Sequence, residues 1–211
     1  MQNNSASSGF TAGTLVHTKD GLVPIEKIKV GDLVLSRAEN MAVGVAPAPK
    51  RVLKTIAYEA MEIKFVGYKN GRNLEDRTYP LFASIKQPFW VKNKGWVETH
   101  LLEGDWLGPS LLVLLNDVIV YCDPIRIFKS NEDSVGWIAY NGFEGKGSTW
   151  NFIENVWGKN VYFDILNWPI HEAIDGGDGD GYRYTATVYN LEVEDFHSYF
   201  VGEHGVLVKS A

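Results

Sequence analysis

The densest group of potential metal ligands in the sequence is a glycine-rich stretch, DGGDGDG, that contains three aspartates. Carboxylate oxygens on a flexible loop suit Ca²⁺, so Asp175, Asp178 and Asp180 are candidate ligands. The spacing of an EF-hand is absent, and no glutamate follows at the position that would complete one. A solvated acidic turn is therefore the favoured interpretation, and the three aspartates are weak metal candidates.

Other residues that could bind a metal or act as a nucleophile are scattered. No cysteine or histidine spacing matches a zinc site, and no phosphate-binding loop or nucleophile elbow is present. The one cysteine, Cys122, lies in the apolar run VIVYCDP, which favours a small buried side chain over a reactive thiol. We therefore expect no cofactor. Four histidines carry no recognisable spacing: His17, His100, His171 and His204.

Composition excludes several classes of protein. The 211 residues are 45% hydrophobic with a formal net charge of -6 and no basic run, which argues against a nucleic-acid partner. The first residues, MQNNSASS, lack the basic start and apolar stretch of a signal peptide. The longest apolar run is interrupted at Asn116 and Asp117, so we expect no membrane span. The compartment stays open: cytoplasmic, or secreted as part of a larger protein.

Strand signals dominate the elements that must position any site. Short segments rich in β-branched and aromatic residues recur between Gly, Asn, Asp and Pro, which predicts an all-β fold. The only helix candidate is STWNFIENVWGK, with Ser148 or Thr149 as N-cap and Gly158 as its end. A turn glycine, a strand, a polar stretch and a Gly-Asp pair occur twice, which suggests a duplicated β unit, with coincidence as an equal alternative. The two pairs are Gly31-Asp32 and Gly104-Asp105.

A central segment differs in amino-acid composition from the two ends of the sequence. It is rich in glycine and tryptophan, and we interpret residues 109–181 as an insertion or elaboration. Its aromatic side chains are expected to form core or a surface for a protein partner rather than a cofactor site. The tryptophans that would build such a surface are Trp137, Trp150, Trp157 and Trp168.

Three segments, in order, carry a resemblance to a known family. The stretch GFTAGTLVHTKDGLVPIEKIKVGDLVLSR resembles the first segment of Hint domains, the Hedgehog/intein fold; SIKQPFWVKNKGWVETHLLEGDWL resembles their second segment. TVYNLEVEDFHSYFVGEHGVLVKSA resembles the last, in the style of Hint domains from bacterial polymorphic toxins. The resemblance implies an all-β, horseshoe-like Hint/intein fold with an inserted segment. The expected parts are a flank (1–8), the first part of the domain (9–108), the insertion (109–181) and the last part (182–211).

The resemblance also implies a chemistry. In the family, a first Cys or Ser attacks the preceding carbonyl, a Thr-x-x-His motif assists, and a terminal His-Asn pair cuts the chain by Asn cyclisation. Most of these positions differ here. Glycine replaces the nucleophile, serine the threonine, glutamine the histidine, lysine the penultimate histidine and serine the terminal asparagine, whereas the second assisting histidine is kept. In that order they are Gly9, Ser84, Gln87, Lys209, Ser210 and His197.

These replacements favour a degenerate domain, inactive in splicing and cleavage, over an engineered knockout. Such a domain would be a structural or interaction module in a larger protein, with flanking domains of the same polypeptide as its partners. The alternative is an active self-cleaving domain that works by an N-to-O or N-to-S acyl shift. Its nucleophile would be displaced, with Ser8 as a disfavoured substitute, or would have been removed by mutation at Gly9. Without catalytic partners, His197 is expected to be a hydrogen-bonded core histidine rather than a base.

Overall fold

The computed structural model describes residues 7–39, 46–69, 78–104, 110–116, 118–130, 132–139, 146–162 and 183–211. It is an all-β structure, as the strand signals predict. The first half contains β1 (Phe10–Thr11), β2 (Leu15–Thr18), β3 (Gly21–Pro24), β4 (Leu33–Ser36), β5 (Ala48–Lys69), β6 (Thr78–Ser84), β7 (Pro88–Val91) and β8 (Gly95–Glu98). The second half contains β9 (Leu111–Val113), β10 (Ile119–Lys129), β11 (Val135–Ala139), β12 (Lys146–Asn151), β13 (Val156–Tyr162), β14 (Thr185–Val193), β15 (Ser198–Val201) and β16 (Val206–Lys209).

The centre of the sheet has a symmetric strand order. Neighbouring strands run β9-β7-β16-β15-β2-β4, so the β15–β16 hairpin near the chain's end separates two similar halves. On one side β2 pairs with β3 and β4, and on the other β7 pairs with β8 and β9. The C-terminal hairpin therefore joins the two halves of the fold.

The two repeated sequence units have the same local structure. After β3 comes the short 3-10 helix η1 (Ile25–Lys27), and after β8 comes η2 (Thr99–Leu101). Each is preceded and followed by extended backbone, and the following residue, Ile28 or Leu102, is a buried apolar side chain. Each repeated sequence unit thus folds as a hairpin, followed by a 3-10 turn and a buried apolar residue.

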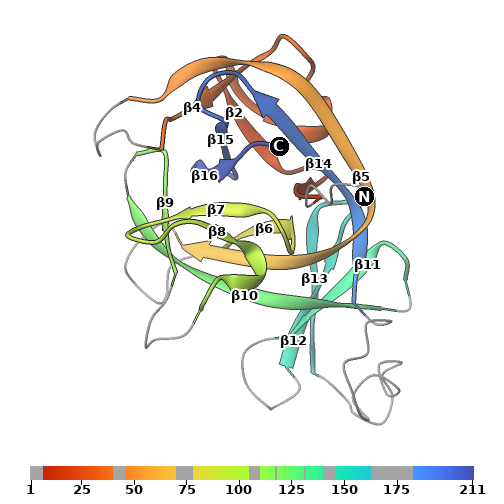
Figure 1. Cartoon of the computed structure of the whole chain (residues 1–211). Helices are drawn as coiled ribbons and strands as arrows, with labels where there is room; N and C mark the ends of the chain where they lie inside the picture. The colour runs from red at the N-terminus through yellow and green to blue at the C-terminus, as the bar shows by residue number, and fades with distance from the viewer. Residues whose placement is uncertain are drawn as a thin grey trace, which may run out of the picture.

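A long curved strand connects this centre to the rest of the molecule. Strand β5 pairs at its start with β4, along its length with β14, and at its end with β6 and β10 (Figure 1). Two apolar clusters fill the space on either side. The larger lies among the central strands, and the smaller, around Phe82, Ile127 and Trp150, packs β11 and β12 against β5, β6 and β10.

The helix expected at residues 148–158 is wrong, because this segment is the β12–β13 hairpin. The side-chain oxygen of Asn151 accepts hydrogen bonds from the backbone N–H groups of Ile153, at 2.9 Å, and Glu154, at 3.0 Å. Asn155 has a φ of 54°, a left-handed conformation that asparagine tolerates better than most residues. These asparagines make a turn where the cap-like residues at the start had suggested a helix.

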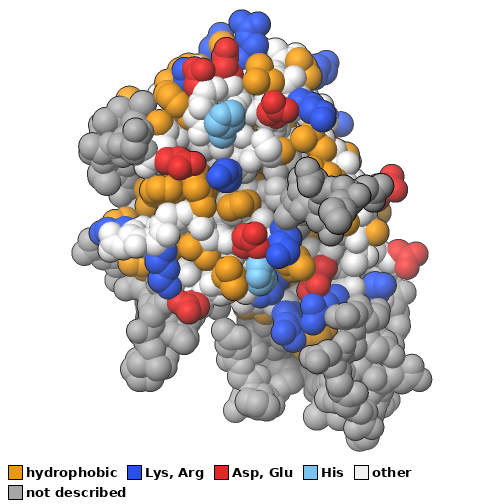
Figure 2. Space-filling model, viewed as in Figure 1, with side chains coloured by type: hydrophobic (Ala, Val, Ile, Leu, Met, Phe, Trp, Pro, Cys, Tyr) orange, Lys and Arg blue, Asp and Glu red, His pale blue; other side chains and the backbone are white. Residues whose placement is uncertain are grey.

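The segment from 109 to 181 contributes strands to the common sheet. Strand β10 pairs with β5 from Cys122 to Arg126, and β9 pairs with β7. The partition into an insertion and two flanking parts remains a prediction. Cys122 is buried, as expected from its apolar neighbours. On the face drawn in Figure 2, basic and acidic side chains are interspersed. No helix among the described residues is long and apolar enough to cross a membrane.

Candidate functional site

The N-terminal strand β1 lies between strands from distant parts of the chain. Phe10 pairs with Tyr189 of β14 on one side and with Ala83 of β6 on the other. Ser84, at the end of β6, holds the backbone beside it: its hydroxyl accepts from the Gly9 N–H at 3.1 Å, and its own N–H donates to the Gly9 carbonyl at 2.9 Å. Gly9 is therefore fixed through its backbone alone.

The preceding carbonyl is held by Asn190, a fully buried residue of β14. The Asn190 side-chain nitrogen donates to the Ser8 carbonyl at 3.1 Å and to the Ser8 hydroxyl at 2.9 Å. Its side-chain oxygen accepts from the Tyr199 hydroxyl at 2.8 Å and from the Leu191 N–H at 2.8 Å. Both polar groups of the Ser8–Gly9 peptide are thus bonded, the carbonyl by Asn190 and the N–H by Ser84.

Gln87 connects this peptide to the C-terminal strand. Its side chain is fully buried, and its amide nitrogen donates to the Lys209 carbonyl at 2.9 Å and to the Pro88 carbonyl at 3.1 Å. Its oxygen accepts from the Asn190 amide at 3.3 Å. Two buried amides in contact therefore bridge the two ends of the described chain, which the resemblance predicts to lie close together.

The C-terminal residues are held mainly by backbone bonds. Ser210 donates its N–H to the His197 carbonyl at 3.0 Å, and the Ala211 N–H donates to the Leu191 carbonyl at 2.9 Å. The Ser210 hydroxyl is buried without a hydrogen-bond partner among the described residues. The Lys209 ammonium lies 5.8 Å from the centre of the Trp96 ring, within range of a cation–π interaction.

His197 is not the core histidine that the sequence analysis expects. Its side chain is exposed, and its backbone has a φ of 48° in the tight turn between β14 and β15. Burial is the property that would have made it a hydrogen-bonded core residue, and the turn instead directs the side chain outward. It enters the site only through its carbonyl, which accepts from Ser210.

The buried side chains at the two junctions are hydroxyls and amides. Burial raises the pKa of the Tyr199 hydroxyl far above its usual value, so this group stays protonated and donates to Asn190. An amide or a protonated phenol cannot exchange a proton near neutral pH. At Gly9, a Cβ would lie 2.5 Å from the Tyr189 carbonyl oxygen, so the backbone would have to shift to accept any side chain. Among the described residues, the side chains that bond the Ser8 and Lys209 carbonyls are therefore amides.

Asn190 and Tyr199 are site residues that sequence reasoning missed. Asn190 occupies an inward position of β14, in phase with buried Val188 two residues earlier. A polar residue at a buried position of an apolar strand is the signal that could have identified it, because such a group needs buried partners.

Of the two expectations for the central tryptophans, core or partner surface, Trp137 and Trp150 fit the core and not the surface. Trp137 and Trp150 are each 7% exposed, because they pack against Phe128 and Phe82 respectively. Trp157 is 40% exposed, beside exposed Val156. Trp168 and the candidate metal ligands Asp175, Asp178 and Asp180 lie outside the described residues. Within the described ranges, no group of three His, Cys, Asp or Glu residues is placed to hold a metal ion.

Comparison with known proteins identifies the fold through structure. No family model and no curated protein matches the sequence. A bacterial intein-like domain from Clostridium thermocellum is 24% identical, covers 97% of this chain and all of its own, and has a TM-score of 0.57. A DnaB intein from Synechocystis is 10% identical, with 97% and 99% coverage and a TM-score of 0.54. The gp41-1 intein is 13% identical, with 97% and 100% coverage and a TM-score of 0.52. The chain therefore has the all-β Hint/intein fold.

Proposed function

We propose that this chain is a Hint-type domain that no longer splices or cleaves itself and acts as a structural module in a larger polypeptide, of the kind found in bacterial polymorphic toxins. The observation that carries the proposal is the buried pair Gln87 and Asn190, whose neutral amides bond the Ser8 carbonyl at the first junction and the Lys209 carbonyl one residue before the second junction. These amides hold the Ser8 and Lys209 carbonyls at the place where the family's proton transfer would occur.

The first junction supports this proposal in two ways. Gly9 has no side chain to attack the Ser8 carbonyl, and a Cβ there would meet the Tyr189 carbonyl oxygen at 2.5 Å. Gln87 stands where the family's motif has histidine, and its amide cannot protonate the leaving nitrogen. A missing nucleophile and a missing acid at the same bond remove both halves of an acyl shift.

The second junction supports it as well. Ser210 has no carboxamide that could cyclise on its own carbonyl, and Lys209 replaces the histidine before it. The exposed His197 side chain offers no buried proton donor in its place. The Lys209 carbonyl is instead bonded by Gln87, which ties the last strand to the first junction.

Such a module would hold its neighbours in the polypeptide. Ser8 and the Lys209 carbonyl enter the same buried network, so segments joined before and after the domain would leave it from neighbouring positions. The flanking domains of the same chain are therefore the partners that the site favours.

Intact-mass spectrometry tests the proposal on the chain placed between two small, stably folded carrier domains. We expect one species of full mass after prolonged incubation from pH 6 to 9, with or without a thiol. A fragment ending at Ser8 or at Ser210, or a ligated pair of carriers, would overturn it. An active intein between the same carriers is the positive control for the assay.

A second candidate function, cleavage at the Ser7–Ser8 bond, rests on one observation. The Ser84 hydroxyl donates a long hydrogen bond, at 3.4 Å, to the Ser7 carbonyl, and the Ser8 hydroxyl is buried nearby. Attack by the Ser8 hydroxyl on the Ser7 carbonyl would form an ester and release the Ser8 amine, and water would then hydrolyse the ester to leave a fragment ending at Ser7. None of the described hydrogen-bond partners of the Ser8 hydroxyl is a base that could take up its proton. A fragment ending at Ser7 that the Ser8→Ala variant no longer produces would support this function against the first.

A further inference from the structure

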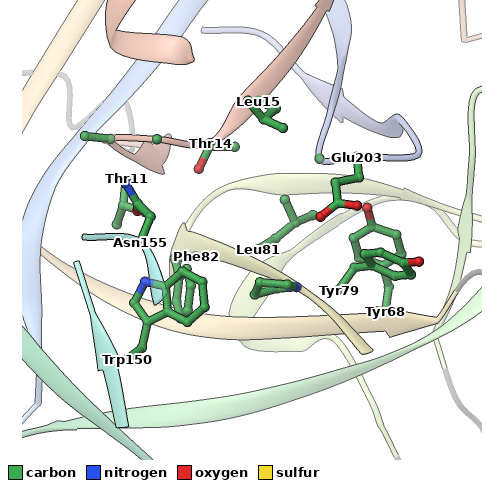
Figure 3. A pocket seen from close by; sticks show the side chains of 14 residues that line it. Thr11, Thr14, Leu15, Tyr68, Tyr79, Leu81, Phe82, Trp150, Asn155 and Glu203 are labelled. Atoms are coloured by element: carbon green, nitrogen blue, oxygen red, sulfur yellow. The ribbon is translucent and has the colours of Figure 1, made fainter. Parts of the chain in front are cut away.

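A cleft opens between strand β6 and the segment that begins at the end of β1 (Figure 3). It has a volume of about 220 Å³ and opens between the backbone of Thr11 to Leu15 and the strand residues Tyr79 to Phe82. Strands β1 and β6 pair only at Phe10 and Ala83. Beyond that pair they diverge, and the cleft fills the resulting wedge. The space is large enough for one or two apolar side chains of a ligand.

The cleft has an aromatic lining with one unused donor. Phe82 and Trp150 pack with ring centres 4.8 Å apart, and Tyr79 and Pro80 continue the apolar surface. Trp150 is more than nine-tenths buried, and its indole N–H has no hydrogen-bond partner among the described residues. In Figure 3 the indole nitrogen lies on the ring edge that faces Asn155, at the rim of the cleft. A buried donor without a partner costs free energy, which an acceptor bound in the cleft would recover.

The strand beside the cleft is unsuited to pairing with a further strand. The Ser84 N–H donates toward β1, so the alternate residues Phe82 and Pro80 also face that edge of β6. Pro80 has no N–H to donate at this edge. A partner would therefore lie across the aromatic rings and would not extend the sheet, which is how polyproline II segments bind their receptors.

Charge at the rim favours a basic partner. Glu203 lines the opening, its side chain is exposed, and Figure 3 shows its carboxylate beside the Tyr68 hydroxyl. The whole chain carries a formal net charge of -6. A single carboxylate at the rim of an apolar cleft favours a cationic residue next to an apolar one.

We propose that this cleft binds a short, extended peptide that contains proline and a lysine or arginine. A prolyl side chain packs on Phe82 and Tyr79, a main-chain carbonyl of the peptide accepts from the Trp150 indole, and the basic side chain lies near Glu203. The proposal is independent of whether the junctions are cleaved, because the lining residues beyond Thr11 do not enter the junction network.

The test uses a fluorescein-labelled decapeptide with two Pro-x-x-Pro repeats and one arginine, titrated with the full chain in 50 mM salt. We expect saturable binding by fluorescence polarisation and a shift of one tryptophan indole N–H signal in ¹H–¹⁵N spectra. Trp150→Phe keeps the ring packing and removes the donor, so it should lose that signal and weaken binding about five- to tenfold.

A second variant, at exposed Glu203, tests the proposal even if Trp150→Phe fails to fold. Glu203→Lys should weaken the arginine peptide at least threefold and strengthen the same peptide with glutamate in place of arginine. The matched control Glu59→Lys reverses an exposed charge on β5 outside the cleft and should change neither affinity. Absence of saturable binding, or affinity that ignores the sign at Glu203, would overturn the proposal. Binding of free indole with no binding of the peptide would also overturn it in favour of a small-molecule site.

Discussion

At the scale of single residues, the junction network depends on Asn190. Replacing Asn190 by alanine would leave the buried Tyr199 hydroxyl and the Gln87 oxygen without their present partners. Each stranded polar group costs about 1–3 kcal/mol, so we expect Asn190→Ala to lower the free energy of unfolding by about 3–5 kcal/mol. Urea unfolding followed by tryptophan fluorescence measures this loss.

Ser8→Ala is the matched control for that variant. It removes one acceptor, the Ser8 hydroxyl, while the Asn190 amide still donates to the Ser8 carbonyl and to Gln87. Its cost should stay near 1 kcal/mol, as for a single replaceable hydrogen bond. Equal losses for the two variants would show that the network does not depend on Asn190.

Residue identity at the junctions could be predicted from the sequence, but side-chain environment could not. The motif order assigned Gly9, Ser84 and Gln87 to positions that the structure brings together. Asn190 was missed because the junction residues it bonds, Gln87 and Ser8, are 103 and 182 residues away along the chain. The exposure of His197 depends on a left-handed backbone in a turn, which a motif match does not report.

At the scale of elements, the β12–β13 hairpin contacts the start of the chain. Gly13 has a φ of 83°, and a Cβ there would lie 2.5 Å from the Asn155 side-chain nitrogen. We expect Gly13→Ala to cost about 1–3 kcal/mol, from the left-handed backbone and from this overlap. Adding Asn155→Gly should recover only the part due to overlap. Thermal unfolding of the two single variants and the double variant separates the contributions, and strict additivity would mean that the hairpin does not press on Gly13.

Turn and cap residues in the sequence predicted some elements correctly and one element incorrectly. The two repeated units each form a hairpin followed by a 3-10 turn and a buried apolar residue, Ile28 or Leu102. The segment from Ser148 onward has helix-like caps, yet its first four residues pair with β11 from Val135 to Ile138. Non-local pairing and the Asn151 turn decide its structure, and neither follows from the caps alone.

At the scale of the whole molecule, the two ends of the chain are joined across the centre of the sheet. The C-terminal hairpin lies between β2 and β7, and His17 of β2 bonds the Gly202 carbonyl at 2.8 Å across 185 residues of sequence. The all-β class followed from strand signals, and the Hint/intein fold followed from the family resemblance. The hydrogen bond between His17 and Gly202 joins residues that are far apart in the sequence, so no local sequence pattern predicts it.

The bond between His17 and Gly202 leads to a prediction of how the free energy of unfolding depends on pH. Burial lowers the pKa of His17 below its usual 6.5; the bond to Gly202 opposes this shift, and the nearby His204 adds to it. The unfolded chain therefore binds a proton at a higher pH than the folded chain, so stability is full above about pH 6.5 and falls as the pH drops toward the folded pKa. Unfolding midpoints measured from pH 7.5 to 5.0 should decline. His17→Gln keeps a donor for Gly202 and removes the titration, so its decline should be smaller; parallel curves for the two proteins would contradict a role for His17 in this pH dependence.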